Sequence, residues 1–467
     1  MSDSTKTTKA YCDTSASRAS AASDVSRPGE SLGRTLARLT WPMVFGVLAL
    51  MGYQLVDSIF ISLLGTAPLA ALGFTVAVNQ VLIGVQIGIG IATTALISRA
   101  LGARQLRRAR SLGVLVMAAG SGLMAMLCLA AWWLRDPILR LLDAETALWP
   151  EIAAYWPPWL ASVWLGAGLY FAYSVARAHG NTRVPGTVMV ITSLLNLVLD
   201  PLFIFAFGWG LPGAAYATLA AFAVGGLIMT SRVRRARWLR YRRDSLPIMR
   251  ALGELAAISG PAMLSQLMPG MAAVAATSIV AGFGAPAVAA WALNTRLEFF
   301  SIVIVLALTM SLPPMVGRFL GAGAYQDIHQ LLRLAARFVL ALQLGIALLW
   351  LSLAWVLPAA LSSDTQVAAY LRLWFISVPF SFGALGVCML MVSATNALGM
   401  PVRAVIISIL RLFAFYLPAL WLGARMAGMT GIYVGVLGGN LLAGLTAWHM
   451  VRRALRRLET TTPSPGR

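Results

Sequence analysis

The chain has 467 residues, of which 59% are hydrophobic and only 11% are charged. Ordinary soluble domains are about one quarter charged, so the composition excludes a soluble globular protein and indicates an integral membrane protein. The formal net charge of +20 would suit a nucleic-acid-binding protein, but the basic residues lie between the apolar runs. We therefore assign the charge to membrane topology and to contact with the lipid bilayer, and expect no nucleic-acid partner.

Residues 1–37 are rich in Ser, Thr and Ala and contain no apolar run. Such a segment buries too little apolar surface to fold and lacks the apolar core of a signal peptide. We therefore predict a disordered cytoplasmic tail. The three cysteines, Cys12, Cys128 and Cys388, are scattered along the chain, so they predict no disulfide or metal framework.

Twelve apolar segments follow, each about long enough to cross a membrane core of roughly 30 Å. In the first half they lie near residues 41–63, 69–97, 112–134, 150–176, 185–207 and 211–231. In the second half they lie near residues 254–281, 287–316, 332–357, 367–395, 402–423 and 429–451. The predicted fold class is an all-α polytopic membrane protein with twelve transmembrane helices.

The basic residues between the segments predict the domain organisation. Residues 38–231 form an N-terminal lobe and residues 251–452 a C-terminal lobe, joined by the basic linker 232–250 and followed by a cytoplasmic tail at 453–467. The linker carries a dense arginine cluster, and the positive-inside rule assigns such loops to the cytoplasm. We therefore expect both termini to be cytoplasmic.

The two halves are related by an internal repeat. Identical residues recur at an offset of 219: Pro42 and Pro261, Gly65 and Gly284, Arg99 and Arg318, Gly102 and Gly321. Because each half holds six spans, both copies cross the membrane in the same direction. In transporters, a parallel repeat of this kind leaves a substrate path between the halves.

Pro42 lies in the first predicted span. Proline removes one backbone hydrogen bond and kinks a helix, so Pro42 is our candidate for a hinge that bends during transport. The glycines inside the spans have an alternative explanation, because small residues also let membrane helices pack closely.

Three acidic residues lie well inside predicted spans: Asp57, Asp200 and Glu298. A charged group in hydrocarbon is costly, so each is a candidate functional residue. Tyr53 lies one helical turn before Asp57 on the same face, where its phenol can donate to the carboxylate. The alternative for Asp57 is a structural carboxylate satisfied by backbone or arginine groups.

Asp200 has a similar neighbour, because Asn196 precedes it by one helical turn. Pro201 follows directly and frees a carbonyl one turn earlier for a water molecule or an ion. Thr218 adds a hydroxyl if the fifth and sixth helices pack antiparallel across their short connection. Carboxylate, amide and hydroxyl oxygens in one cluster suit a proton or, through hard oxygen ligands, a Na⁺ ion.

The repeat provides an internal control for these acids. Ala276 is the partner of Asp57 at the offset of 219, and Tyr416 is the partner of Asp200 at an offset of 216. The duplicated fold therefore does not require carboxylates at these positions. We infer that only the N-terminal half contains an ion site.

Glu298 has Arg296 nearby in the sequence, but residues i and i+2 point apart on a helix. Arg411, in the eleventh span, is the more suitable partner. Two interpretations stay open for Glu298: a structural pair within the C-terminal half, or a part of the substrate cavity together with Arg296.

The sequence carries no signature of an enzyme. The histidines, His179, His329 and His449, lie near predicted membrane ends, and neither a His-Glu-x-x-His motif nor a phosphate-binding loop is present. We therefore expect no catalytic residues, no cofactor and no metal other than H⁺ or Na⁺ as a coupling ion.

Several short motifs follow one another in a specific order. They are Trp41-Pro42, Val56-Asp57-Ser58-Ile59-Phe60, Gly180-Asn181-Thr182-Arg183-Val184-Pro185, Asn196 to Phe205, and Gly213-Ala214-Ala215-Tyr216-Ala217-Thr218. Each motif alone is weak, but in this order and spacing the chain resembles the multidrug and toxic compound extrusion (MATE) family over residues 38–455.

The resemblance implies two six-helix lobes in a V shape, which expel cations or lipophilic drugs against an inward flow of H⁺ or Na⁺. The acids look like those of the DinF-like branch, where a cluster in the N-terminal lobe binds the coupling ion. That role carries over to Asp57, Asn196, Asp200 and Thr218, and we assign Tyr53 to the same coupling-ion site. Tyr155 and Gln54 are candidates for the substrate cavity. The NorM-like branch has acids in the seventh and tenth spans, which this sequence lacks, so the resemblance favours a proton site.

These observations predict a monomeric multidrug efflux antiporter of a bacterial inner membrane, which exports amphipathic or cationic small molecules in exchange for H⁺ by alternating access. A Na⁺-coupled drug antiporter and a flippase for lipids or lipid-linked sugars are the alternatives. A membrane sensor is a third class, and the lack of a soluble sensory domain argues against it.

Overall fold

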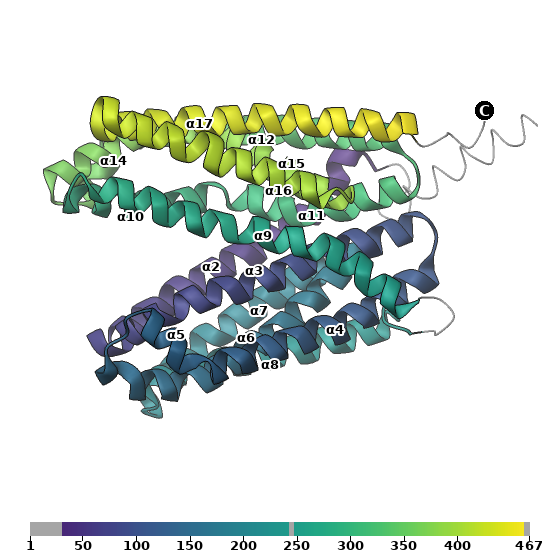
Figure 1. Cartoon of the computed structure of the whole chain (residues 1–467), viewed down its shortest axis with the longest axis horizontal. Coiled ribbons are helices and arrows are strands. Elements are labelled where there is room, and N and C mark those ends of the chain that lie inside the picture. Colours follow the sequence, from purple (N-terminus) through teal and green to yellow (C-terminus); the bar gives the residue numbers. More distant parts are fainter. Residues whose placement is uncertain (1–29, 242–246, 462–467) are drawn as a thin grey trace, which may run out of the picture. The chain divides into compact units, whose positions relative to one another are not determined.

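The computed structural model describes residues 30–241 and 247–461 (Figure 1). This part of the chain is built from helices, because a lipid-embedded backbone must satisfy its hydrogen bonds within each segment. In the first half they are α2 (Leu32–Ser62), α3 (Thr66–Gly102), α4 (Leu106–Trp133), α5 (Arg135–Leu141), η1 (Thr146–Leu148), α6 (Trp149–Ala178), α7 (Arg183–Pro201), η2 (Leu202–Ala206) and α8 (Gly210–Arg235). In the second half they are α9 (Ile248–Ala281), α10 (Ala285–Ser301), α11 (Val303–Gly321), α12 (Tyr325–Leu353), α13 (Leu357–Leu361), α14 (Thr365–Ser377), η4 (Val378–Ser381), α15 (Phe382–Ala397), α16 (Pro401–Ile409), η5 (Leu410–Tyr416) and α17 (Leu417–Thr461).

The described helices account for the twelve predicted spans. Eleven helical stretches are long and apolar enough to cross a membrane, the last of them Pro401–Thr460. That last stretch contains two spans, because the backbone leaves helical geometry at Ala427 and at Gly428, where φ is 60°. Glycine adopts such a left-handed conformation without a steric penalty, and it divides the stretch into an eleventh and a twelfth span.

The predicted tails and linker lie partly outside the described residues, which exclude 1–29, 242–246 and 462–467. Helix α2 already begins at Leu32, so the last residues of the predicted disordered tail are helical. Leu36 is buried there, which gives this short stretch a packing partner that its polar composition did not reveal. Helix α17 continues to Thr461, so much of the predicted C-terminal tail is helical as well.

Contacts among the described residues divide the chain into two compact units. The first unit consists of Arg38–Leu101 and Gln105–Met263. The second consists of the described residues from Leu264 onward, together with residues 30–37 and Gly102–Arg104. The boundary falls inside α9, so that helix begins in the first unit and ends in the second.

The core of the first unit is packed around α6 and its neighbours. The side chains of Trp156 and Phe171 are fully buried. A Cβ atom at Gly120 of α4 would lie 2.9 Å from the Phe171 ring, so α4 approaches α6 closely only because Gly120 has no side chain. Such contacts through small residues are typical of membrane helices, whose association gains little from the hydrophobic effect.

The backbone confirms the internal repeat. Left-handed residues recur 219 positions apart, as Gly65 and Gly284, Arg104 and Gly323, and Gly180 and Gly399, and 218 apart as Gly210 and Gly428. The last two pairs bracket the fifth span and its copy. The structural counterpart of Asp200 is therefore Pro418 or Ala419, and the predicted pairing of Asp200 with Tyr416 is wrong.

The register error has a physical cause in the π-helical segments. Segment η2 (Leu202–Ala206) follows the fifth span after Pro201, whereas η5 (Leu410–Tyr416) lies before Pro418 in the copy. A π-helical turn adds a residue relative to α-helix, and it does so at different points in the two halves. The conclusion from the internal control survives, because neither Pro418 nor Ala419 is acidic.

Helix α2 is unbroken through Pro42 and touches α7 closely at that point. A Cβ atom at Gly186 of α7 would collide with the carbonyl oxygen of Pro42, and one at Gly46 would lie 3.1 Å from the Met189 sulfur and 3.2 Å from the Gly186 Cα. The proposed hinge thus lies at a crossing of two backbones, where glycine on both helices leaves room for the contact.

We expect Gly186→Ala to lower the free energy of unfolding by about 1 to 3 kcal/mol, because the added methyl group overpacks the crossing against a backbone carbonyl. Thermal unfolding of the detergent-purified protein measures the change. Gly226→Ala is the matched control, since no atom lies within 4 Å of a Cβ at that position of α8. Equal stability of the two variants would contradict the packing argument.

Candidate functional site

Four of the predicted site residues gather in the first unit. Asp57 is on α2, Asn196 and Asp200 are on α7, and Thr218 is on α8. The side chain of Asp200 is 1% exposed and that of Asn196 is 2% exposed, while Asp57 and Thr218 are half-buried. Two carboxylates therefore share one largely apolar interior.

Asn196 connects the other two polar groups of this cluster. Its amide contacts Asp200 Oδ2 at 2.9 Å and the Thr218 hydroxyl at 3.0 Å. An amide has a donor end and an acceptor end that can exchange places. With Asp200 ionised, Asn196 Nδ2 donates to the carboxylate and Oδ1 accepts from Thr218.

The opposite amide orientation matches a protonated Asp200. The carboxylic acid then donates to Asn196 Oδ1, and Nδ2 donates to the Thr218 hydroxyl. Thr218 in turn donates to the carbonyl of Ala214 at 3.1 Å. The three side chains are therefore hydrogen-bonded in both protonation states of Asp200, which is the property that a reversible proton site requires.

The local fold explains why these residues meet. The short connection between η2 and α8 makes α7 and α8 antiparallel neighbours, as predicted. Gly213 lets the start of α8 touch the chain at Phe203, where a Cβ would lie 2.7 Å from the Phe203 carbonyl oxygen. This contact positions Thr218 opposite Asn196 and confirms the predicted proximity of their side chains.

Asp57 and two tyrosines complete the cluster. The side chains of Asp57 and Asp200 interact electrostatically with each other and with the phenols of Tyr53 and Tyr155. Tyr155 is buried and stacks on Trp159 with 6.2 Å between ring centroids. Its ring is thereby fixed beside the two acids.

Gln54 follows Tyr53 in α2 and is exposed. One oxygen of each acid, Asp57 Oδ1 and Asp200 Oδ1, is buried without a hydrogen-bond partner among the described residues. A buried acceptor of this kind is costly unless a proton, a water molecule or a cation satisfies it.

The direct contact between Asn196 and Asp200 leaves no gap for a metal ion between these two side chains. A metal ion needs several oxygen ligands converging on one point, but the Asn196 amide is already in direct contact with the Asp200 carboxylate. In the orientation that suits ionised Asp200, the amide presents N–H groups rather than oxygen to that carboxylate.

Comparison with known proteins identifies the family. The family model described as MatE matches residues 42–202 and again residues 261–422. The chain belongs to the MATE family. The two matches fall on the two copies of the internal repeat, so this MATE protein is a multi-pass membrane transporter and not an enzyme.

Individual relatives cover nearly the whole MATE chain. A FAD transporter of Shewanella oneidensis is 30% identical over 443 residues, which are 92% of this chain and 97% of that protein. The multidrug export protein MepA of Staphylococcus aureus is 23% identical over 450 residues, covering 92% and 95%. The crystal structure of the Vibrio cholerae MATE transporter VcmN in the bent form shares 51% identity, with a TM-score of 0.89 and coverage of 95% of this chain and 98% of that one.

The remaining predicted site residues of this MATE protein are in its second unit. Glu298 on α10 is half-buried and interacts electrostatically with Arg411 on η5, as expected, but the two side chains form no direct ion pair. Arg411 also interacts electrostatically with the buried Cys388 of α15. Arg296 is exposed on the same helix as Glu298.

Sequence reasoning missed two features of the second unit. Helix α10 ends at Ser301 and α11 begins at Val303, so the predicted eighth span is interrupted at Ile302. Asn294 donates a buried hydrogen bond of 3.0 Å to the Tyr433 hydroxyl. The distance in sequence between Asn294 and Tyr433 gave no signal for this contact.

We expect Thr218→Val to destabilise this MATE protein by about 1 kcal/mol, because the isosteric change removes one hydrogen bond from a buried amide. Thermal unfolding in detergent measures it. Thr295→Val is the matched control, since the Thr295 hydroxyl is exposed and donates to the carbonyl of Trp291 in its own helix, much as Thr218 does to Ala214. The same shift in both variants would argue against a bond from Thr218 to Asn196.

Proposed function

We propose that this MATE transporter is a proton-coupled antiporter that exports amphipathic, cationic small molecules across a bacterial inner membrane. The observation that carries the proposal is the 2.9 Å contact between the Asn196 amide and Asp200. That contact accommodates either protonation state of the acid. It also leaves no space for a metal ion between the two groups.

The transport cycle follows from the chemistry of the two acids. Protons entering from outside bind Asp57 and Asp200 and neutralise the cluster. The Asn196 amide then reverses, so that it accepts from Asp200 and donates to Thr218. Neutral acids no longer attract a cationic substrate, which is released outward, and loss of the protons to the cytoplasm restores the charge for the next substrate.

Bending of α2 near Pro42 is the proposed conformational step. Asp57 lies about four turns after Pro42, roughly 22 Å along the helix axis, so a small rotation at the hinge moves the acid appreciably. MATE transporters are described in both a bent form and a straight conformation, which supports a bending step for this chain.

The proton gradient supplies sufficient energy for such export. One charge crossing 100 mV contributes about 2.3 kcal/mol, which corresponds to roughly a 50-fold concentration ratio. No nucleotide is required. Monomeric transport is sufficient, since the four clustered side chains all come from one unit of one chain.

A second candidate substrate is suggested by the FAD transporter of Shewanella oneidensis. A flavin dinucleotide is an anion, and the second unit offers Arg411 and Arg296 inside predicted spans. The acids of the first unit instead favour a cation, so we place the amphipathic cation first.

We expect Asp57→Asn and Asp200→Asn each to abolish drug efflux in cells while the protein is still expressed, because an amide cannot take up a proton for exchange. Asp136→Asn is the matched control, since Asp136 is exposed and paired with Arg135 at 3.2 Å, and it should retain efflux. Glu298→Gln should reduce efflux less than either intramembrane aspartate variant. Full efflux by either Asp57→Asn or Asp200→Asn would contradict the assignment of these aspartates to the coupling-ion site.

Proteoliposomes separate the two substrate classes and the two coupling ions. We expect ethidium to release protons from preloaded liposomes and an imposed pH gradient to drive its accumulation, while a Na⁺ gradient has no effect. FAD should not elicit the same proton flux. Proton release with FAD but not with ethidium would favour the dinucleotide, and accumulation driven by Na⁺ alone would exclude proton coupling.

A further inference from the structure

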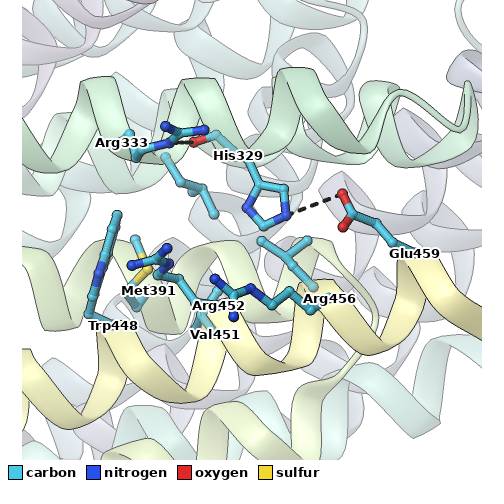
Figure 2. Close-up of a pocket in the computed structure, with 10 residues that line it drawn as sticks. His329, Arg333, Met391, Trp448, Val451, Arg452, Arg456 and Glu459 are labelled. Atoms are coloured by element: carbon cyan, nitrogen blue, oxygen red, sulfur yellow. Dashed lines mark hydrogen bonds and ion pairs between the residues drawn. The ribbon is translucent and has the colours of Figure 1, made fainter.

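A cavity of about 210 Å³ opens between α12 and α17 in the second unit (Figure 2). Its polar lining consists of His329 and Arg333 from α12, and Arg452, Arg456 and Glu459 from α17. The ion cluster is in the other unit. Nothing in the proposed transport cycle uses this cavity.

The cavity carries uncompensated positive charge. Its one lining carboxylate, Glu459, lies with Oε1 3.2 Å from His329 Nε2. Among the described residues, no carboxylate lies within ion-pair distance of the guanidinium groups of Arg333, Arg452 or Arg456. Three cations around one small cavity favour an anionic ligand, and guanidinium groups match the oxygens of a phosphate.

Two of the three arginines have local contacts. Arg333 Nε donates to the backbone carbonyl of His329 at 3.3 Å, and Figure 2 shows this bond beside the one between His329 and Glu459. The guanidinium of Arg452 lies 5.9 Å from the centre of the Trp448 ring. The cavity is therefore a formed site with a tryptophan on its wall.

Along α12, basic residues near the start of the helix are followed by exposed apolar residues. His329, Arg333 and Arg337 follow one another at intervals of four residues, so they share one helical face. Arg333 and Arg337 also line a second hollow of about 600 Å³ beside the first. Further along the helix, Leu344 and Leu348 are exposed.

Helix α17 carries the same order of residues on its own exposed face. Leu441 and Leu445 are exposed, and Trp448, Arg452 and Arg456 follow at helical spacing. Each helix therefore offers basic side chains at its end and exposed leucines toward the middle of its span. A ligand that satisfies both parts needs an anionic head and apolar chains.

We propose that this cavity binds the phosphate group of an anionic phospholipid, with the acyl chains along the exposed leucines of α12 and α17. Basic pockets between transmembrane helices are suited to such headgroups. Tryptophan favours the level of the headgroups at a membrane interface, which agrees with the position of Trp448 between leucines and arginines.

The test uses the full-length protein in nanodiscs of phosphatidylcholine with a fraction of phosphatidylglycerol, and counts retained lipids by native mass spectrometry. We expect phosphatidylglycerol to be retained in preference to phosphatidylcholine. The variant R333Q/R452Q/R456Q should bind phosphatidylglycerol about 100-fold more weakly, at roughly five-fold for each arginine near the surface. Equal retention of the two lipids by the native protein would overturn the proposal.

Matched variants distinguish a site from general charge attraction. R232Q/R234Q/R235Q removes three exposed arginines at the end of α8, away from the cavity lining, and should retain phosphatidylglycerol as the native protein does. R333K/R452K/R456K keeps the charge but loses the guanidinium groups, so it should bind phosphatidylglycerol more strongly than R333Q/R452Q/R456Q and more weakly than the native protein; binding no stronger than that of the glutamine variant would count against a charge-based site. Equal loss in the α8 variant and the cavity variant would overturn the proposal.

Glu459→Gln supplies a gain of binding, which misfolding cannot imitate. Removal of the one lining carboxylate should strengthen retention of phosphatidylglycerol by about five-fold, and unchanged or weaker retention would count against the site. Inorganic phosphate, added to the phosphatidylglycerol nanodiscs, should leave lipid retention unchanged. Displacement of the lipid by it would assign the cavity to free phosphate instead.

Discussion

The hydrogen bond between Asn196 and Asp200 constrains much of the first unit. A carboxylate that is 1% exposed is tolerated in an apolar interior only with polar partners. The amide of Asn196 provides one, and it needs Thr218 of α8 to satisfy its other end. The small residues of α8 follow from this requirement, because Gly213 permits the close contact at Phe203 that brings Thr218 within reach.

The repeat separates what the fold requires from what the function requires. Both halves contain a π-helical segment in the fifth span or its copy, so this irregularity belongs to the scaffold. The acids do not recur in the second copy, because the counterpart of Asp57 is Ala276 and the counterpart of Asp200 is Pro418 or Ala419. The second unit instead has the half-buried Glu298 within electrostatic range of Arg411, without a direct ion pair between them. Proton exchange is thus expected in only one of two similar units.

The sequence predicted the parts of the structure that depend on composition and local spacing. The spans, the repeat and the meeting of Asn196 with Thr218 follow from apolar length, recurring Gly and Pro, and a short connection. The break at Ile302 and the π-helical turns were not predicted. They depend on which backbone carbonyl accepts the hydrogen bond of each N–H group, and the spacing of apolar residues does not determine this acceptor. The amide contact of Asn196 was foreseen only as a neighbour relation, since its two orientations become visible only once Thr218 and Asp200 are both located.

The close contact at Pro42 limits how α2 can move relative to α7. Gly186 leaves no free space at the Pro42 carbonyl, and a Cβ atom at Gly46 would lie 3.2 Å from the Gly186 Cα of α7. Two helices in such backbone contact cannot slide past each other without separating, whereas one can tilt about the contact. Proline favours a local change of direction because the helix lacks one hydrogen bond there. We therefore propose that the crossing acts as a pivot, so that a small bend there displaces Asp57, roughly 22 Å further along the helix, relative to Asp200.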